Sequence, residues 1–94
     1  MTTEELFSAT VSALRSVTGE SQARIGEALG LTPSAVSYKL RGRAGWSLGD
    51  VEALSRHFGI PVPDLMAGPT WALEKLPKAR RMACVGGRQE VIPV

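Results

Sequence analysis

The chain contains little cysteine, few aromatic residues and no long apolar run. Its one cysteine, Cys84, excludes an internal disulfide. Its role is then that of a small apolar side chain or a free thiol, or alternatively of a redox switch or an intermolecular disulfide. With only two Trp, two Phe and one Tyr, the core must be mostly aliphatic. No apolar run approaches the roughly 20 residues of a membrane span, and the start MTTEELFSAT lacks the basic region of a signal peptide. We therefore expect one small cytoplasmic protein without membrane contact.

Motifs for catalysis or metal binding are also missing. His57 is the one histidine, and no acid or cysteine lies at a spacing typical of a catalytic or metal-binding partner. We expect it at the surface near the end of a helix. The sequence contains no phosphate-binding loop, metal-ligand cluster or catalytic triad. These absences predict a protein that is not an enzyme and that needs no metal or cofactor.

The net charge of +2 is small but unevenly distributed. Residues 21–45 carry four basic side chains against one acidic side chain, and residues 69–94 carry five against two. Residues 1–20 and 46–68 are both net acidic. Local positive charge suits a polyanionic partner, although an ordinary solvated surface is the alternative.

Apolar spacing and capping residues predict an all-α protein, a compact bundle of four to five short helices. A first helix is expected over residues 3 to about 17. A later helix begins at Ser47, where Asp50 completes a capping box, and it ends at Gly59. A short helix over residues 62–67 follows. No strand alternation occurs in this part of the sequence.

The chain divides into residues 1–68, the helical domain, and residues 69–94, a C-terminal extension. The segment 70–76, TWALEKL, is expected to form one or two helical turns. Further on, the Gly-Gly pair at 86–87 is a hairpin-turn signal. A short β-hairpin and a disordered tail are the two alternatives for the end of the chain.

Residues 21–42, SQARIGEALGLTPSAVSYKLRG, predict two short helices joined by a tight turn. Ser21 and Thr32 are suitable N-caps, and Gly30 permits the left-handed backbone that ends a helix. The second helix directs Val36 inward and keeps a different, polar face. That face consists of Ser34, Ser37, Tyr38 and Arg41. Hydroxyl, phenol and guanidinium groups can reach DNA bases and phosphates, so the pattern indicates a helix-turn-helix DNA-binding unit.

The sequence from about residue 3 to residue 68 resembles the Cro/repressor-type, or lambda-repressor-like, helix-turn-helix family of phage and bacterial regulators. The matching marks are Ser21–Gln22, Ile25–Gly26, Leu29–Gly30, Val36–Ser37, Arg41–Gly42, Phe58–Gly59–Ile60 and Asp64–Leu65. The resemblance implies a four- or five-helix bundle whose third helix enters the major groove. Two positions depart from the family. Pro33 stands where many members carry a base-reading Gln, and Gly26 stands where alanine is usual.

The resemblance also implies which residues contact DNA. Base contacts are expected from Ser34, Ser37, Tyr38 and Arg41. Phosphate contacts are expected from Gln22, Thr32, Lys39, Arg43 and Ser47. Arg41 is expected to pair with guanine and Tyr38 to pack on a thymine methyl group, with a phosphate contact as the alternative for Arg41.

The function implied is that of a dimeric, sequence-specific repressor on double-stranded DNA with a two-fold operator. The expected dimer contact consists of Trp71, Leu73, Leu76, Met82, Val85, Val91 and Ile92. The polar side of this dimer contact is then formed by the basic side chains Lys75, Lys78, Arg80 and Arg81. Alternatively, these four side chains form a DNA-binding arm. Other readings are an antitoxin that autoregulates its operon and binds a toxin through its tail, a restriction–modification controller, and a scaffold protein that does not bind DNA.

Overall fold

The computed structural model describes residues 2–81, a part of the chain that contains six α-helices, one 3₁₀ turn and no strand. The elements are α1 (Thr3–Thr18), α2 (Gln22–Leu29), α3 (Pro33–Leu40), α4 (Leu48–Phe58), α5 (Val62–Met66), α6 (Pro69–Lys75) and η1 (Lys78–Arg80). The all-α prediction is confirmed, and the β-hairpin predicted near residues 86–87 lies outside the described residues. Within residues 2–81, no helix has the length and hydropathy to span a bilayer.

Capping boxes define where two of the longer helices begin. The Thr2 hydroxyl accepts a hydrogen bond from the Glu5 amide, and the Glu5 carboxylate accepts one from the Thr2 amide. Ser47 and Asp50 make the same reciprocal pair at α4, as the sequence predicts. Such pairs satisfy amide groups that have no partner within the helix, so they fix the first turn of each helix.

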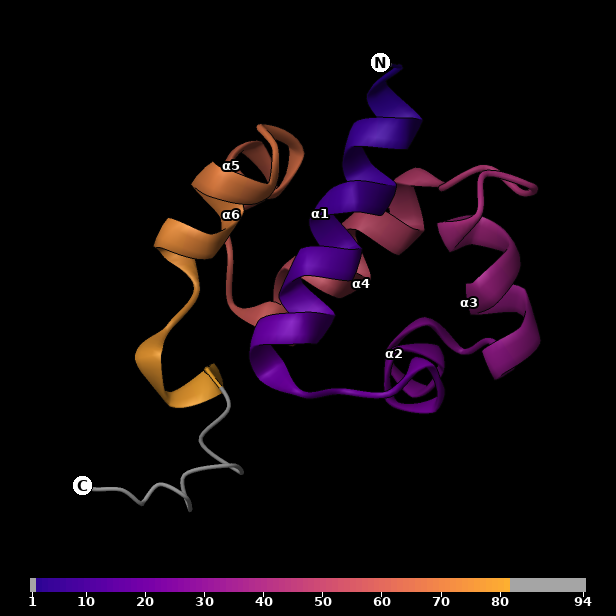
Figure 1. Cartoon of the computed structure of the whole chain (residues 1–94), viewed down its shortest axis with the longest axis horizontal. Coiled ribbons are helices and arrows are strands. Elements are labelled where there is room, and N and C mark those ends of the chain that lie inside the picture. The colour runs from indigo at the N-terminus through magenta and orange to yellow at the C-terminus, as the bar shows by residue number, and fades with distance from the viewer. Residues whose placement is uncertain (1, 82–94) are drawn as a thin grey trace.

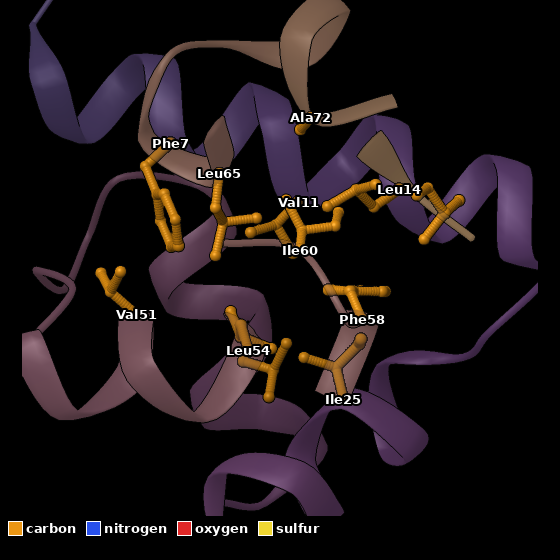
Figure 2. Close-up of a cluster of buried hydrophobic side chains, with 12 residues drawn as sticks. Phe7, Val11, Leu14, Ile25, Val51, Leu54, Phe58, Ile60, Leu65 and Ala72 are labelled. Atoms are coloured by element: carbon orange, nitrogen blue, oxygen red, sulfur yellow. The ribbon is translucent and has the colours of Figure 1, made fainter. Parts of the chain in front are cut away.

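The core is aliphatic with two phenylalanines (Figure 2). It consists of Phe7, Val11, Leu14, Ile25, Val36, Val51, Leu54, Phe58, Ile60, Leu65, Ala72 and Leu76. Phe58 is fully buried and has the largest of the side chains without exposed surface. Because α1 to α6 all contribute, this one core determines how the helices are held relative to each other.

Helix α1 runs through the middle of the bundle, with α5 and α6 on one side and α2 and α3 on the other (Figure 1). Helix α6 packs on α1, and its Ala72 is completely buried there. Leu76, just after α6, is also in the core. Residues 69–76 therefore share the core of the helical domain, although the sequence assigns them to an extension. Of the residues expected in a dimer contact, Leu76 is thus a core residue, whereas Trp71 is 55% exposed.

Gly26 allows α2 to approach the turn that follows it. Its carbonyl oxygen accepts a hydrogen bond from the Leu31 amide at 2.8 Å. A Cβ atom at residue 26 would lie 2.5 Å from the Leu31 carbonyl oxygen and 3.5 Å from Val36 Cγ2. The first distance is far too short for two atoms that are not bonded. The glycine that departs from the family pattern is therefore required by this backbone.

Gly26→Ala is expected to lower the free energy of unfolding by roughly 1–3 kcal/mol, because the added methyl group must displace backbone atoms. Helix propensity alone predicts the opposite, a gain of about 1 kcal/mol. Thermal unfolding followed by circular dichroism measures the difference. Gly49→Ala is the matched control, because a Cβ there meets only Ser47 Oγ, at an ordinary 3.6 Å. A Gly26→Ala protein that melts at or above the wild-type temperature contradicts this account.

Candidate nucleic-acid interface

Helices α2 and α3 are joined as the sequence predicts. The Ser21 hydroxyl accepts a hydrogen bond from the Arg24 amide at 3.1 Å, and the Thr32 hydroxyl accepts one from the Ala35 amide at 3.2 Å. Between them, Gly30 has a φ of 72°, in the left-handed region. This turn ends α2 and starts α3 within three residues. It therefore fixes the angle between α2 and α3.

Helix α3 has one buried and one exposed side. Val36 is fully buried, and Leu40 packs against the core. On the other side Ser34, Tyr38 and Arg41 are exposed, with Tyr38 at 53% exposure. Ser37, the fourth residue of the expected base-reading face, is half-buried. The four expected base-contacting residues thus lie on one short segment at the outer edge of the bundle (Figure 1).

The expected phosphate-contacting residues other than Lys39 flank this helix. Gln22 is the first residue of α2 and is half-buried, and Thr32 is the exposed N-cap of α3. Arg43 is exposed in the loop after α3, where its amide donates a hydrogen bond to the Tyr38 carbonyl oxygen at 2.8 Å. Ser47 is the exposed N-cap of α4. Three of these four residues thus lie at helix N-termini, which attract anions through their free amide groups and dipoles.

Lys39 departs from the expectation of a phosphate contact. Its Nζ lies 2.8 Å from Asp50 Oδ2 and donates a hydrogen bond to the Gly45 carbonyl oxygen at 2.6 Å. The same Nζ lies 5.7 Å from the centroid of the Trp46 ring. The Lys39 and Asp50 side chains are only 14% and 13% exposed. The ammonium group is thus bound inside the protein, between α3, the following loop and α4.

A second set of contacts ties the same region to α1. Trp46 Nε1 donates a hydrogen bond to Ser8 Oγ at 2.8 Å, and Ser8 Oγ donates one to the Lys39 carbonyl oxygen at 3.1 Å. The Trp46 ring also packs edge-on against Phe7, with 5.1 Å between ring centroids. Lys39, Asp50, Trp46 and Ser8 form what we call the Lys39 cluster. It joins the C-terminal half of α3 to both α1 and α4.

The Lys39 cluster lowers the pKa of Asp50. Burial of the carboxyl group by itself raises its pKa. Hydrogen bonds from Lys39 and Ser47, together with the positive charge of Lys39, outweigh this effect, and the pKa falls below its ordinary value of 3.8. A carboxylate that is ionised more readily in the folded state stabilises that state.

Stability that depends on Asp50 is expected to be fully present well above the unfolded-state pKa of 3.8 and to be lost as the pH falls through the lowered folded-state pKa. Asp50→Asn keeps the shape and removes the charge. The difference in free energy of unfolding between wild type and Asp50→Asn should therefore be largest near neutral pH and should shrink towards pH 2.5. Urea denaturation at a series of pH values measures it. Glu52→Gln, at an exposed carboxylate on the same helix, is the control. A difference for Asp50→Asn that stays constant down to pH 2.5 contradicts the assignment.

His57 lies in a cluster that the sequence does not predict. Its Nε2 is 3.0 Å from Glu20 Oε1, and Arg80 Nη2 donates a hydrogen bond to Glu20 Oε2 at 3.1 Å. The His57 side chain is only 13% exposed. The expectation of a surface histidine without an acidic partner is therefore wrong. Glu20 lies 37 residues from His57 and 60 residues from Arg80 in the chain, so no local pattern reveals the cluster. Their contacts hold η1 against the end of α1 and α4.

A helix with one buried face, a tight turn and a second helix with an exposed polar face are the features of helix-turn-helix DNA-binding units. The family model described as a helix-turn-helix domain matches residues 6–67, from α1 to just beyond α5. The chain belongs to this family, which supports a role in DNA-binding regulation. No curated protein and no solved structure matches the chain.

Proposed function

We propose that this protein is a sequence-specific transcriptional regulator that places α3 in the major groove of double-stranded DNA. The observation that carries the proposal is the exposed polar side of α3, opposite the buried Val36. Large aliphatic side chains are needed to bury a helix face, and this side has none of them. Its hydroxyl, phenol and guanidinium groups instead match the donors and acceptors on base edges.

In this proposal the residues that flank α3 fix the position of the protein on the DNA, and the residues of α3 recognise the base sequence. Gln22, Thr32, Arg43 and Ser47 bind phosphates on either side of the groove. Arg41, at the C-terminal end of α3, is placed to donate two hydrogen bonds to one guanine. Tyr38 supplies an aromatic surface for a thymine methyl group. Because Pro33 cannot donate a hydrogen bond at the start of α3, the reading shifts towards the C-terminal half of the helix.

The biological role that we propose is repression by occupancy of an operator, as in Cro/repressor-type regulators of phages and bacteria. The protein then acts in the cytoplasm, where the DNA is, and carries out no catalysis. We also propose that two copies bind a two-fold operator. Of the described residues that are expected in the dimer contact, Trp71 is exposed and Leu73 is half-buried beside the core. Met82, Val85, Val91 and Ile92 lie outside the described residues.

Analytical ultracentrifugation of the full chain and of a chain that ends at Arg81 tests the dimer. This truncation keeps Ala72 and Leu76 in the core, which a deletion from residue 70 does not. The proposal expects a dimer that the truncation weakens. A full-length protein that is a monomer and binds DNA as a monomer rejects the dimer. A toxin-like gene next to the gene for this protein favours the antitoxin alternative, in which the tail binds a different protein.

Binding to operator DNA and to unrelated DNA at several salt concentrations tests the DNA proposal. The logarithm of the binding constant should fall linearly with the logarithm of the salt concentration, by about 0.9 for each phosphate that the protein neutralises. DNA binding that is absent or insensitive to salt contradicts the proposal and favours a scaffold protein.

A further inference from the structure

The Lys39 cluster is adjacent to the proposed reading residues, but the Lys39 and Asp50 side chains are mostly buried. Lys39 directly follows Tyr38 and comes two residues before Arg41. Its side chain crosses from α3 to Asp50 at the start of α4, and it reaches the loop at Gly45. We propose that Lys39 is a positioning residue, one that determines how well the protein discriminates between DNA sequences without contacting DNA. This inference rests on the proposed function.

The geometry is unfavourable for a phosphate contact by Lys39. An ammonium group has three N–H donors, and here the Nζ is already shared between a carboxylate oxygen, a carbonyl oxygen and the face of an indole ring. To reach a phosphate, Lys39 must give up all of these contacts. It also leaves the carboxylate of Asp50 buried without its positive partner, which is costly.

The same geometry favours a positioning role. Asp50 also completes the capping box of α4, so the start of α4 and the end of α3 share one carboxylate. The loop between these helices carries the exposed Arg43, and Trp46 connects the loop to Ser8 on α1. Groups that read a base edge must be held within about 0.5 Å of the right geometry. The Lys39 cluster restrains the segment that carries Tyr38, Arg41 and Arg43.

The test compares Lys39→Met with Arg43→Met, a matched loss of one positive charge at the exposed loop residue. Binding constants are measured for a selected operator and for unrelated duplex DNA over a salt series, at a temperature where circular dichroism shows each variant folded. For Lys39→Met we expect the wild-type dependence of the binding constant on salt concentration, which we call the salt slope. We also expect the ratio of the binding constant for the operator to that for unrelated DNA to fall about tenfold, an effect comparable to losing one base contact. Arg43→Met is expected to reduce the slope by about 0.9 and to weaken binding to both DNAs alike.

Two further variants separate positioning from a general loss of structure. Lys39→Met combined with Asp50→Asn leaves no unpaired buried charge, so it keeps the test valid if Lys39→Met alone unfolds. The double variant is expected to show the same lowered ratio. Lys39→Arg, which keeps the charge near Asp50, is expected to recover most of the ratio.

The inference is overturned if Lys39→Met reduces the salt slope by about 0.9 and weakens binding to both DNAs by the same factor, because Lys39 is then a phosphate contact. It is also overturned if the folded double variant keeps the wild-type ratio. Failure of the proposed function gives a different result, since the wild-type protein itself then shows no preference for any DNA sequence.

Discussion

Phe58→Ala is expected to lower the free energy of unfolding by about 3–5 kcal/mol, the usual cost of removing a buried aromatic side chain. Phe58 has no exposed surface, and it belongs to the same buried cluster as Ile25, Leu14 and Ile60 (Figure 2). Alanine there leaves a cavity among residues of α1, α2 and α4. A small domain has a total stability of about 5–15 kcal/mol, so this variant approaches complete loss of the folded state.

Thermal unfolding monitored by circular dichroism measures the effect of Phe58→Ala. Tyr38→Ala, measured without DNA, is the matched control, an aromatic residue with 53% exposure on α3. Surface changes of this kind usually alter stability by less than about 0.5 kcal/mol. Similar losses for the two variants contradict the core described for residues 2–81.

Arg41→Ala is expected to weaken binding to the operator by roughly 1–3 kcal/mol, or about 5- to 150-fold, if the guanidinium reads a guanine. Arg41 is exposed at the end of α3, and removing it leaves the buried side of the helix unchanged. Binding to unrelated DNA should change far less. The loss should also be greatest for operators that keep the base pair read by Arg41.

Fluorescence anisotropy with labelled duplexes measures both affinities for Arg41→Ala. Arg56→Ala is the control, because Arg56 is an exposed arginine on α4 outside the proposed interface. An equal loss on all DNA sequences shows that Arg41 contacts a phosphate, which was the alternative from the sequence. No loss at all places Arg41 outside the interface.

Most of the local structure was predictable because it depends on residues close in the sequence. A capping box needs only positions three apart, and the sequence predicts the one formed by Ser47 and Asp50. The turn between α2 and α3 likewise follows from Gly30 and the N-cap Thr32. The buried and exposed sides of α3 follow from helical periodicity, as Val36 and Tyr38 show.

Contacts between distant segments were not predictable in this way. The charge of Lys39 suggests a phosphate contact, and only the folded chain shows that Asp50 and Trp46 surround the ammonium group. His57 has no acidic neighbour at helical spacing, yet folding brings Glu20 to it. These side chains are polar and partly buried, so their partners depend on how the helices pack rather than on any repeating pattern.

The position of α6 has a similar explanation. The sequence from residue 69 onward follows Gly68 and is net basic, and its apolar residues are expected in a dimer contact, so the sequence assigns it to an extension. The structure nevertheless packs α6 on α1 and buries two apolar side chains, those of Ala72 and Leu76, in the shared core.

Sequence-specific DNA binding is tested most directly by selecting bound duplexes from a random pool with the purified full-length chain. We expect one enriched motif and, for a dimer, a palindrome whose half-site centres lie about 10 base pairs apart. Arg41→Ala should then lose preference at one position of each half-site. A pool that shows no enrichment after repeated rounds, with wild-type protein that is folded, contradicts the proposal that α3 reads DNA.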